Sequence, residues 1–207
     1  LPGNIVKVDG FLNHRVDTRL LEDIADEFAK YFDTSKITVV LTAEASGIAL
    51  ATICAQKYGV PMLFAKKAKS DNIESGLYQS EVFSYTYKKR VTLLVSQEWL
   101  NADDHVLIID DFMANGFAVQ GLVDIVNEAG AKLEGIGIAV EKGFQGGGDR
   151  LRAEGVAKIL PKQLEIIRNQ YLHHFITCPA HIWAAARRRT SPSPVCFLPE
   201  GFQHVPG

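Results

Sequence analysis

Two adjacent carboxylic acids, Asp110 and Asp111, follow an apolar run at residues 106–109 and precede a loop of mostly small residues. The apolar run indicates a buried strand, and the residues from about 116 onwards have the spacing of a helix. A strand that ends in a tight loop at a helix N-terminus directs several backbone N–H groups to one point, where the helix dipole adds partial positive charge. We therefore expect the loop to bind a phosphate group. The two carboxylates can accept hydrogen bonds from sugar hydroxyls and stabilise positive charge that develops on a sugar ring.

The predicted phosphate-binding loop spans residues 114–118 and contains several small side chains. Small side chains allow phosphate oxygens to approach the backbone closely. The alternative interpretation is that Asp110 and Asp111 only cap the helix that follows, because short acidic side chains accept hydrogen bonds from helix N-termini. The residues expected to hold the phosphate are Ala114, Asn115, Gly116, Phe117 and Ala118.

Strands alternate with helices along the chain, and this alternation determines where the acids and the loop must lie. Apolar spacing predicts helices at residues 18–32, 47–58 and about 116–129, the first with Asp17 or Thr18 as its N-cap. Short apolar runs predict strands at residues 37–42, 60–64, 80–86, 91–96, 106–110 and 135–141. Such an order is typical of an α/β fold with a parallel sheet between helices, in which ligands bind beyond the carboxyl ends of the strands. The functional loops are then expected at residues 43–47, 65–80, 110–118 and 142–149.

The segment VLIIDDFMANGFA at residues 106–118 resembles the signature with which type I phosphoribosyltransferases bind 5-phosphoribosyl 1-diphosphate (PRPP). The resemblance implies the fold of that family, a central and mainly parallel sheet flanked by helices, with a small hood that residues 70–90 would form. It also implies that Asp110 and Asp111 are the catalytic acids. One departure is Ala118, because many members of the family carry Thr or Ser near the end of this loop. Backbone donors would therefore do more of the phosphate binding.

Two further loops resemble the diphosphate-binding parts of the same family. In the EASG segment at residues 44–47, Ser46 and the Gly47 amide would donate hydrogen bonds to the diphosphate, and an ordinary strand-to-helix turn is the alternative. In the AKKAKS segment at residues 65–70, Lys67 is the candidate contact, because flexible ammonium groups can hold and then release a concentrated anion. A solvated lysine-rich turn is the alternative there.

Three segments narrow the resemblance to the bacterial members of the family that use xanthine. They are VKVDGFLNH at residues 6–14, HVLIIDDFMANG at residues 105–116 and VEKGFQ at residues 140–145. The resemblance implies that Val6 and Asn13 contact the base and that Lys142 binds one of its exocyclic oxygens. Xanthine carries two carbonyl oxygens and is acidic enough for partial negative charge, so a lysine donor suits it, and Asn13 offers both a donor and an acceptor. A surface lysine and a turn-forming asparagine are the alternatives.

The reaction implied is attack by a purine ring nitrogen on the anomeric carbon of PRPP, which yields xanthosine 5′-monophosphate and diphosphate. Phe112 or Phe144 could stack on the purine. Mg²⁺ would be bound mainly through PRPP and water, with no direct protein ligand, and no residue is assigned as a general base. Competing hypotheses are a guanine/hypoxanthine or adenine phosphoribosyltransferase, and a PRPP- or purine-sensing regulator of the same fold. The regulator would need a helix-turn-helix and a basic face, and residues 1–155 show neither.

Composition limits the partners that the chain can have. Its 207 residues are 47% hydrophobic, which is enough for one α/β domain, and the net charge of −2 favours neither nucleic acid nor anionic lipid. No apolar run is long enough to cross a membrane or to form a signal peptide, so we expect a cytoplasmic protein. Three cysteines lack the number for a full disulfide framework and the spacing of a zinc site. The family resemblance implies a homodimer.

The last part of the chain differs in composition from the rest. Of the 24 acidic residues, only Glu165 and Glu200 follow Gly155, and most of the prolines and histidines lie there. We expect a phosphoribosyltransferase domain at residues 1–155 and an atypical segment at residues 156–207, which is either an aberrant or partly disordered terminus or a natural extension. Residues 156–170 retain helical spacing.

Overall fold

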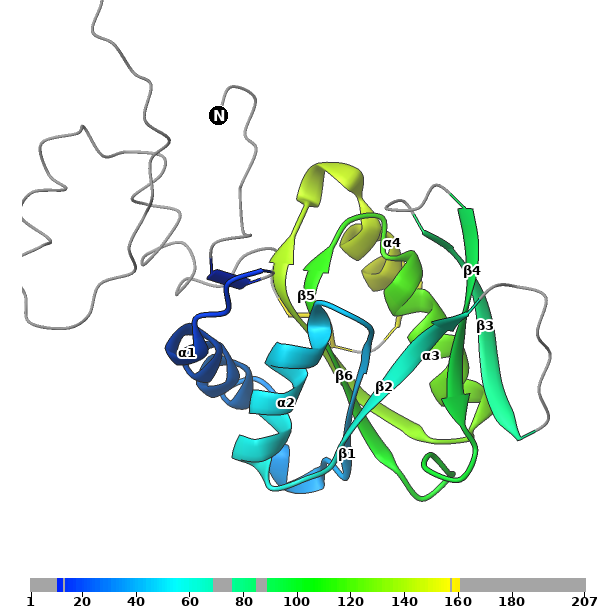
Figure 1. Ribbon diagram of the computed structural model, residues 1–207, viewed down its shortest axis with the longest axis horizontal. Coiled ribbons are helices and arrows are strands. Elements are labelled where there is room, and N and C mark those ends of the chain that lie inside the picture. The colour runs from blue at the N-terminus through cyan, green and yellow to red at the C-terminus, as the bar shows by residue number, and fades with distance from the viewer. Residues whose placement is uncertain (1–10, 13, 69–75, 85–88, 157, 161–207) are drawn as a thin grey trace, which may run out of the picture.

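The computed structural model describes residues 11–12, 14–68, 76–84, 89–156 and 158–160 (Figure 1). Within these residues, helices and strands alternate as the apolar spacing predicts. The helices are α1 (Thr18–Ala29), α2 (Gly47–Tyr58), α3 (Phe117–Glu128) and α4 (Gly147–Ala153), with short 3₁₀ turns η2 (Thr34–Lys36) and η3 (Gly143–Gln145). The strands are β1 (Val39–Ala43), β2 (Met62–Ala68), β3 (Leu77–Ser84), β4 (Lys89–Ser96), β5 (His105–Met113) and β6 (Lys132–Glu141).

The strands form one sheet in the order β3-β4-β2-β1-β5-β6. Neighbouring strands from β2 through β1 and β5 to β6 are parallel, whereas β4 pairs antiparallel with both β2 and β3. The carboxyl ends of β1, β2, β5 and β6 therefore meet at one edge, which is where the functional loops begin. The antiparallel pair β3 and β4 continues the sheet beside this edge, and we call these two strands the hood. The predicted fold class, an α/β sheet with a small hood, is confirmed.

Alternating residues of the central strands supply two separate hydrophobic cores. On β1, Val40 packs against α1 and α2, whereas Val39 and Leu41 face α3. On β5, Leu107 and Ile109 take the first side, and Val106 and Ile108 take the second. Figure 1 shows α1 and α2 on one side of the sheet and α3 on the other. Burial on both faces explains why these strands read as continuous apolar runs in the sequence.

Local signals define the ends of the helices that carry the site. Asp17, one of the two predicted N-caps, accepts hydrogen bonds from the N–H groups of Arg19 and Leu20 and so begins α1. Gly59 ends α2 in the left-handed conformation, with φ 72°.

None of the helices that the structure describes combines the length and the apolar composition that a membrane span requires.

Two expectations need correction. Strand β5 continues through Met113, beyond the predicted end at residue 110, so Asp111 lies on the strand together with Asp110. They remain in the sheet because β6 pairs with β5 as far as Met113 and Glu141. The helical spacing noted for residues 156–170 is also not realised at residues 158–160. Ile159 forms a parallel bridge with Ile136, because the outer edge of β6 offers backbone groups to which residues 158 and 160 hydrogen bond.

The rest of the atypical C-terminal segment, residues 161–207, lies outside the described residues, as does residue 157. The division of the chain at residue 155 therefore stays a prediction. Residues 158–160 nevertheless belong to the folded body, since Ile159 and Leu160 are buried and each contributes to one of the two cores.

Candidate active site

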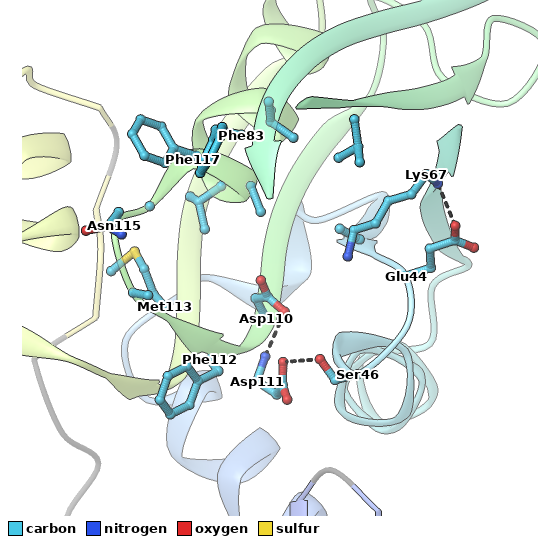
Figure 2. Close-up of a pocket in the computed structure, with 17 residues that line it drawn as sticks. Glu44, Ser46, Lys67, Phe83, Asp110, Asp111, Phe112, Met113, Asn115 and Phe117 are labelled. Atoms are coloured by element: carbon cyan, nitrogen blue, oxygen red, sulfur yellow. Dashed lines mark hydrogen bonds between the residues drawn. The ribbon is translucent and has the colours of Figure 1, made fainter. Parts of the chain in front are cut away.

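A pocket opens at the carboxyl end of β5, between the loop after β1, the end of β2 and the hood (Figure 2). Its volume is about 270 Å³, near the lower limit of small-molecule sites. Most of its lining is one continuous stretch of chain, residues 110–119, which contains both predicted acids and the whole predicted phosphate-binding loop. The other lining residues are Ala43, Glu44, Ser46, Lys67, Val82, Phe83 and Val91.

The two acids differ in their hydrogen bonds although both are buried. Asp110 is 7% exposed and accepts the backbone N–H of Asp111 at 3.0 Å, and Asp111 is 1% exposed. Burial and the adjacent negative charge of Asp111 raise the pKa of Asp110 well above its usual range, and Lys67 opposes this effect only partly. The Oδ2 atom of Asp111 is buried without a hydrogen-bond partner among the described residues. A ligand hydroxyl at this point would supply the missing donor.

Loop 44–47 approaches the acids from the end of β1. The Ser46 hydroxyl donates to Oδ1 of Asp111 over 2.8 Å, although these residues are 65 positions apart. Gly47 packs just as closely, because a Cβ atom there would overlap the Thr42 hydroxyl and lie 2.7 Å from Oδ1 of Asp110. Ser46 lines the pocket, whereas Gly47 lies behind it. The predicted diphosphate loop and the acid pair are therefore one connected structure.

Lys67 stands on the opposite wall of the pocket from the phosphate loop. Figure 2 shows its side chain extending from β2 towards the pocket. Its backbone N–H donates to Oε1 of Glu44 over 2.6 Å, which fixes the end of β2 against loop 44–47. The ammonium group thus reaches a region that also contains Ser46 and the acids, as a diphosphate contact requires.

The phosphate-binding loop makes the turn from β5 into α3. Gly116 adopts φ 76° at the N-cap of α3, a left-handed conformation that residues with a Cβ rarely adopt. No side chain caps this helix end. This helix end presents backbone N–H groups and the positive end of the helix dipole at the pocket, which is the arrangement that the sequence predicts for a phosphate site.

Two phenylalanines line the pocket, Phe117 from the start of α3 and Phe83 from the hood (Figure 2). Sequence reasoning did not single out Phe83, Val82, Val91 or Glu44 as lining residues. The sequence of β3 has no alternation of polar and apolar residues that would indicate the inward side of Val82, and the pairing of the hood with the rest of the sheet could not be read from the local sequence.

The predicted base-binding residues are placed only in part. Lys142 follows β6 directly and does not line the pocket, but its Nζ atom lies 4.7 Å from the centroid of the Phe112 ring, and Phe112 does line it. Such a distance is typical of a cation–π contact. Phe144, the other candidate for stacking, is 82% exposed and does not line the pocket. Val6 and Asn13 lie outside the described residues.

Most of the chain matches a known protein family. The model of the phosphoribosyl transferase domain matches residues 16–162. The chain belongs to the phosphoribosyltransferase family. Its phosphoribosyltransferase domain thus includes β1 to β6 and all of the lining residues of the pocket.

Within this family, the chain is similar to proteins that are named xanthine phosphoribosyltransferases. This phosphoribosyltransferase is 54% identical to the xanthine phosphoribosyltransferase of Bifidobacterium longum over 154 residues, which is 74% of the chain and 80% of that protein. It is 55% identical over 152 residues to the xanthine phosphoribosyltransferase of Ruminiclostridium cellulolyticum, covering 73% of the chain and 80% of that protein.

Solved structures show the same fold at lower sequence identity. The adenine phosphoribosyltransferase of Saccharomyces cerevisiae aligns with a TM-score of 0.59 at 18% identity and covers 70% of this chain and 80% of its own. The adenine phosphoribosyltransferase of Trypanosoma brucei aligns with a TM-score of 0.59 at 20% identity, and the alignment covers 82% of this chain and 78% of that protein. At this identity, the likeness supports the fold and not the choice of base.

Proposed function

We propose that the protein transfers the 5-phosphoribosyl group of PRPP to xanthine, which forms xanthosine 5′-monophosphate and diphosphate. The observation that carries the proposal is that one pocket combines the buried acids Asp110 and Asp111 with loop 114–118, which leads into the N-terminus of α3, where no side chain caps the helix. Relatives at 50–55% identity that are named xanthine phosphoribosyltransferases support the choice of base. This reaction is one of purine salvage.

The acids would act on the ribose. A purine ring nitrogen forms a bond to the anomeric carbon while the bond from that carbon to the diphosphate oxygen breaks, and the purine loses a proton to solvent. Positive charge develops on the ribose ring as the diphosphate departs. Asp111, with one oxygen unpartnered, would accept a ribose hydroxyl, and the negative charge of the pair would stabilise the ring.

The two ends of PRPP would be held on different walls of the pocket. The 5′-phosphate would bind the N–H groups of residues 114–118, where Ala118 offers no hydroxyl. The diphosphate would contact Lys67 and loop 44–47, in which Ser46 and Gly47 are the predicted donors. Holding both ends fixes the anomeric carbon for attack, which lowers the entropic cost of reaching the transition state.

Mg²⁺ is the cofactor that the family resemblance implies. Among the described residues, no group of three or more His, Cys, Asp or Glu side chains is placed to hold a metal ion. Carboxylate and phosphate oxygens are the ligands that Mg²⁺ prefers, and it usually retains several waters, so an ion carried by PRPP fits a pocket with two carboxylates. Bound there, it would neutralise charge on the departing diphosphate.

Lys142 would recognise the base. Its position over Phe112 places a positive charge beside an aromatic ring that borders the pocket. A purine stacked on Phe112 would bring an exocyclic oxygen near the Lys142 ammonium group, and the partial negative charge of xanthine strengthens this contact relative to hypoxanthine or adenine. The same proposal includes Val6 and Asn13 as base contacts.

Diphosphate release from PRPP with Mg²⁺ tests the proposal, with xanthine, guanine, hypoxanthine and adenine offered separately. Xanthine should be the preferred base, and Lys142→Ala should lower kcat/KM for xanthine by about tenfold or more, which corresponds to one charged hydrogen bond. Lys132→Ala, at the far end of β6 and paired with Glu134, is the matched control and should retain activity. Preference for another purine would contradict the base assignment, and no turnover with any purine would contradict the enzymatic function.

A cytoplasmic homodimer completes the proposal, on the basis of the family resemblance. Light scattering of the purified chain should give twice the mass of 22.8 kDa. A monomeric mass that persists at high concentration together with full activity would contradict the dimer.

A further inference from the structure

Helix α4 lies directly beneath the phosphate-binding loop. A Cβ atom at Gly147, the first residue of α4, would overlap the carbonyl oxygen of Ala114 and lie 2.7 Å from the backbone nitrogen of Gly116. On the other side of the contact, a Cβ atom at Gly116 would lie 3.1 Å from Cδ1 of Leu151. The backbone of the loop therefore rests on the backbone of α4, with no room for a side chain between them.

An ion pair attaches α4 to the end of β6. Arg152 donates to the Glu141 carboxylate through both Nη1 and Nη2, at 3.3 Å and 2.9 Å. The Glu141 side chain is only 1% exposed and that of Arg152 is 30% exposed. Hydrogen bonds to the neighbouring carboxylates of Glu141 and Asp149 raise the pKa of Arg152, so its guanidinium group stays charged. Gly148 makes the attachment possible, because a Cβ atom there would overlap the Glu141 carboxylate.

The same strand end is tied to the loop from the opposite direction. The N–H of Lys142 donates to the carbonyl oxygen of Met113 over 2.8 Å. Strands β5 and β6 are therefore hydrogen bonded to each other up to their carboxyl ends. The loop that follows Met113 is thus confined between the end of β6 and the start of α4. Backbone N–H groups that bind an anion must converge on one point, and this confinement determines their directions.

We propose that Gly147 and the Glu141–Arg152 ion pair are positioning residues that shape loop 114–118 into the 5′-phosphate site, an inference that rests on the proposed function. Neither Gly147 nor Arg152 lines the pocket, so both act through the loop backbone. Phosphate binding depends more strongly on the shape of the loop in this chain, because Ala118 supplies no hydroxyl group. The phosphate would then be bound mainly by backbone N–H groups, which must point in the right directions.

The test measures two ligands that occupy opposite ends of the pocket. Titration calorimetry of the full chain with ribose 5-phosphate and, separately, with magnesium diphosphate is compared for the unchanged protein and Gly147→Ala. The variant should bind ribose 5-phosphate about tenfold or more weakly, because a misplaced loop misdirects several donors at once. Its affinity for diphosphate should change less than about twofold, since Ser46 and Lys67 belong to loop 44–47 and β2 and not to loop 114–118, against which α4 packs. Ala153→Ser, an exposed change on α4, is the matched control.

Arg152→Lys provides a second variant if Gly147→Ala fails to fold. It retains the positive charge but loses the two-pronged geometry of the guanidinium group, so it should shift ribose 5-phosphate affinity in the same selective way. Equal weakening of both ligands, or no change in either, would overturn the inference while leaving the proposed function in place. If the unchanged protein binds neither ligand, the proposed function fails and the inference fails with it.

Discussion

The Ser46 hydroxyl donates a hydrogen bond to Oδ1 of Asp111 over 2.8 Å. It connects the loop after β1 with the acid pair on β5, so the predicted diphosphate and ribose sites share one side chain contact. It also satisfies one Asp111 oxygen and leaves Oδ2 for a ligand. The orientation of the Asp111 carboxylate is thus determined before any ligand binds, which reduces the reorganisation that the reaction requires.

Ser46→Ala should lower kcat/KM for PRPP about tenfold. A hydrogen bond to a charged group contributes roughly 1.5–3 kcal/mol, and without this bond the Asp111 carboxylate is less well oriented for the reaction. Steady-state kinetics with PRPP varied at saturating base measures the effect. Ser35→Ala, whose hydroxyl bonds to Asp33 far from the pocket, should keep the original rate. Equal kinetics for the Ser46 variant and the unchanged protein would show that the contact has no role in turnover.

Asp110→Asn should abolish most of the activity and yet stabilise the fold at neutral pH. The raised pKa of Asp110 means that ionising this side chain costs free energy in the folded state. The stability that depends on its proton is fully present below the ordinary Asp pKa of about 4, and it is lost as pH rises from there through the raised value. Asparagine keeps an oxygen for the Asp111 N–H and carries no charge.

Urea denaturation of the Asp110→Asn protein at several pH values measures this difference. The variant should be more stable by about 1 kcal/mol at pH 7, and the difference should shrink to near zero below pH 4. Turnover should fall by about two orders of magnitude or more. Asp103→Asn, on an exposed turn, should change neither quantity. If the Asp110→Asn variant were less stable than the unchanged protein at pH 7, ionisation of the acid pair would cost the folded state little free energy.

Gly47→Ala should destabilise the protein by about 1–3 kcal/mol, because the new methyl group would overlap the Thr42 hydroxyl and crowd Asp110. Crowding of Asp110 should also raise KM for PRPP. Thermal unfolding and kinetics on the same sample measure both effects. Ala49→Ser, two residues further along α2 and only partly buried, is the control. An unchanged melting temperature would show that loop 44–47 can move away from the acids.

Lys67→Met should weaken the binding of magnesium diphosphate about tenfold, because it removes a charge but keeps most of the side chain. Lys66→Met removes the same charge from the neighbouring residue of β2, whose side chain points to the other face of the sheet. Calorimetry of both variants separates a direct contact from general attraction, since a general effect of net charge would weaken both equally.

Much of the fold follows from local patterns in the sequence. The apolar run at residues 106–109, the acids after it and the glycine at position 116 predict a strand, a turn and a helix N-terminus, and the structure contains all three. A parallel strand is apolar throughout because both of its faces are buried, and a phosphate-binding loop is short and has small side chains. Both features are therefore visible within about fifteen residues of sequence. The parallel order and the position of the site at the carboxyl edge follow from the alternation of strands and helices.

Contacts between distant segments could only come from the tertiary structure. Nothing near Ser46 indicates that its hydroxyl faces Asp111, and nothing near Gly147 indicates that α4 supports loop 114–118. Likewise, the extension of β5 to Met113 depends on pairing with β6, and the position of Phe83 depends on the antiparallel pairing of β4 with β2. By itself, the sequence determined which chemical groups the site contains, because residue type and short spacing are local properties. The structure decided which of those groups touch, because sheet order and close packing bring together residues as far apart in the sequence as Ser46 and Asp111, which are separated by 65 positions.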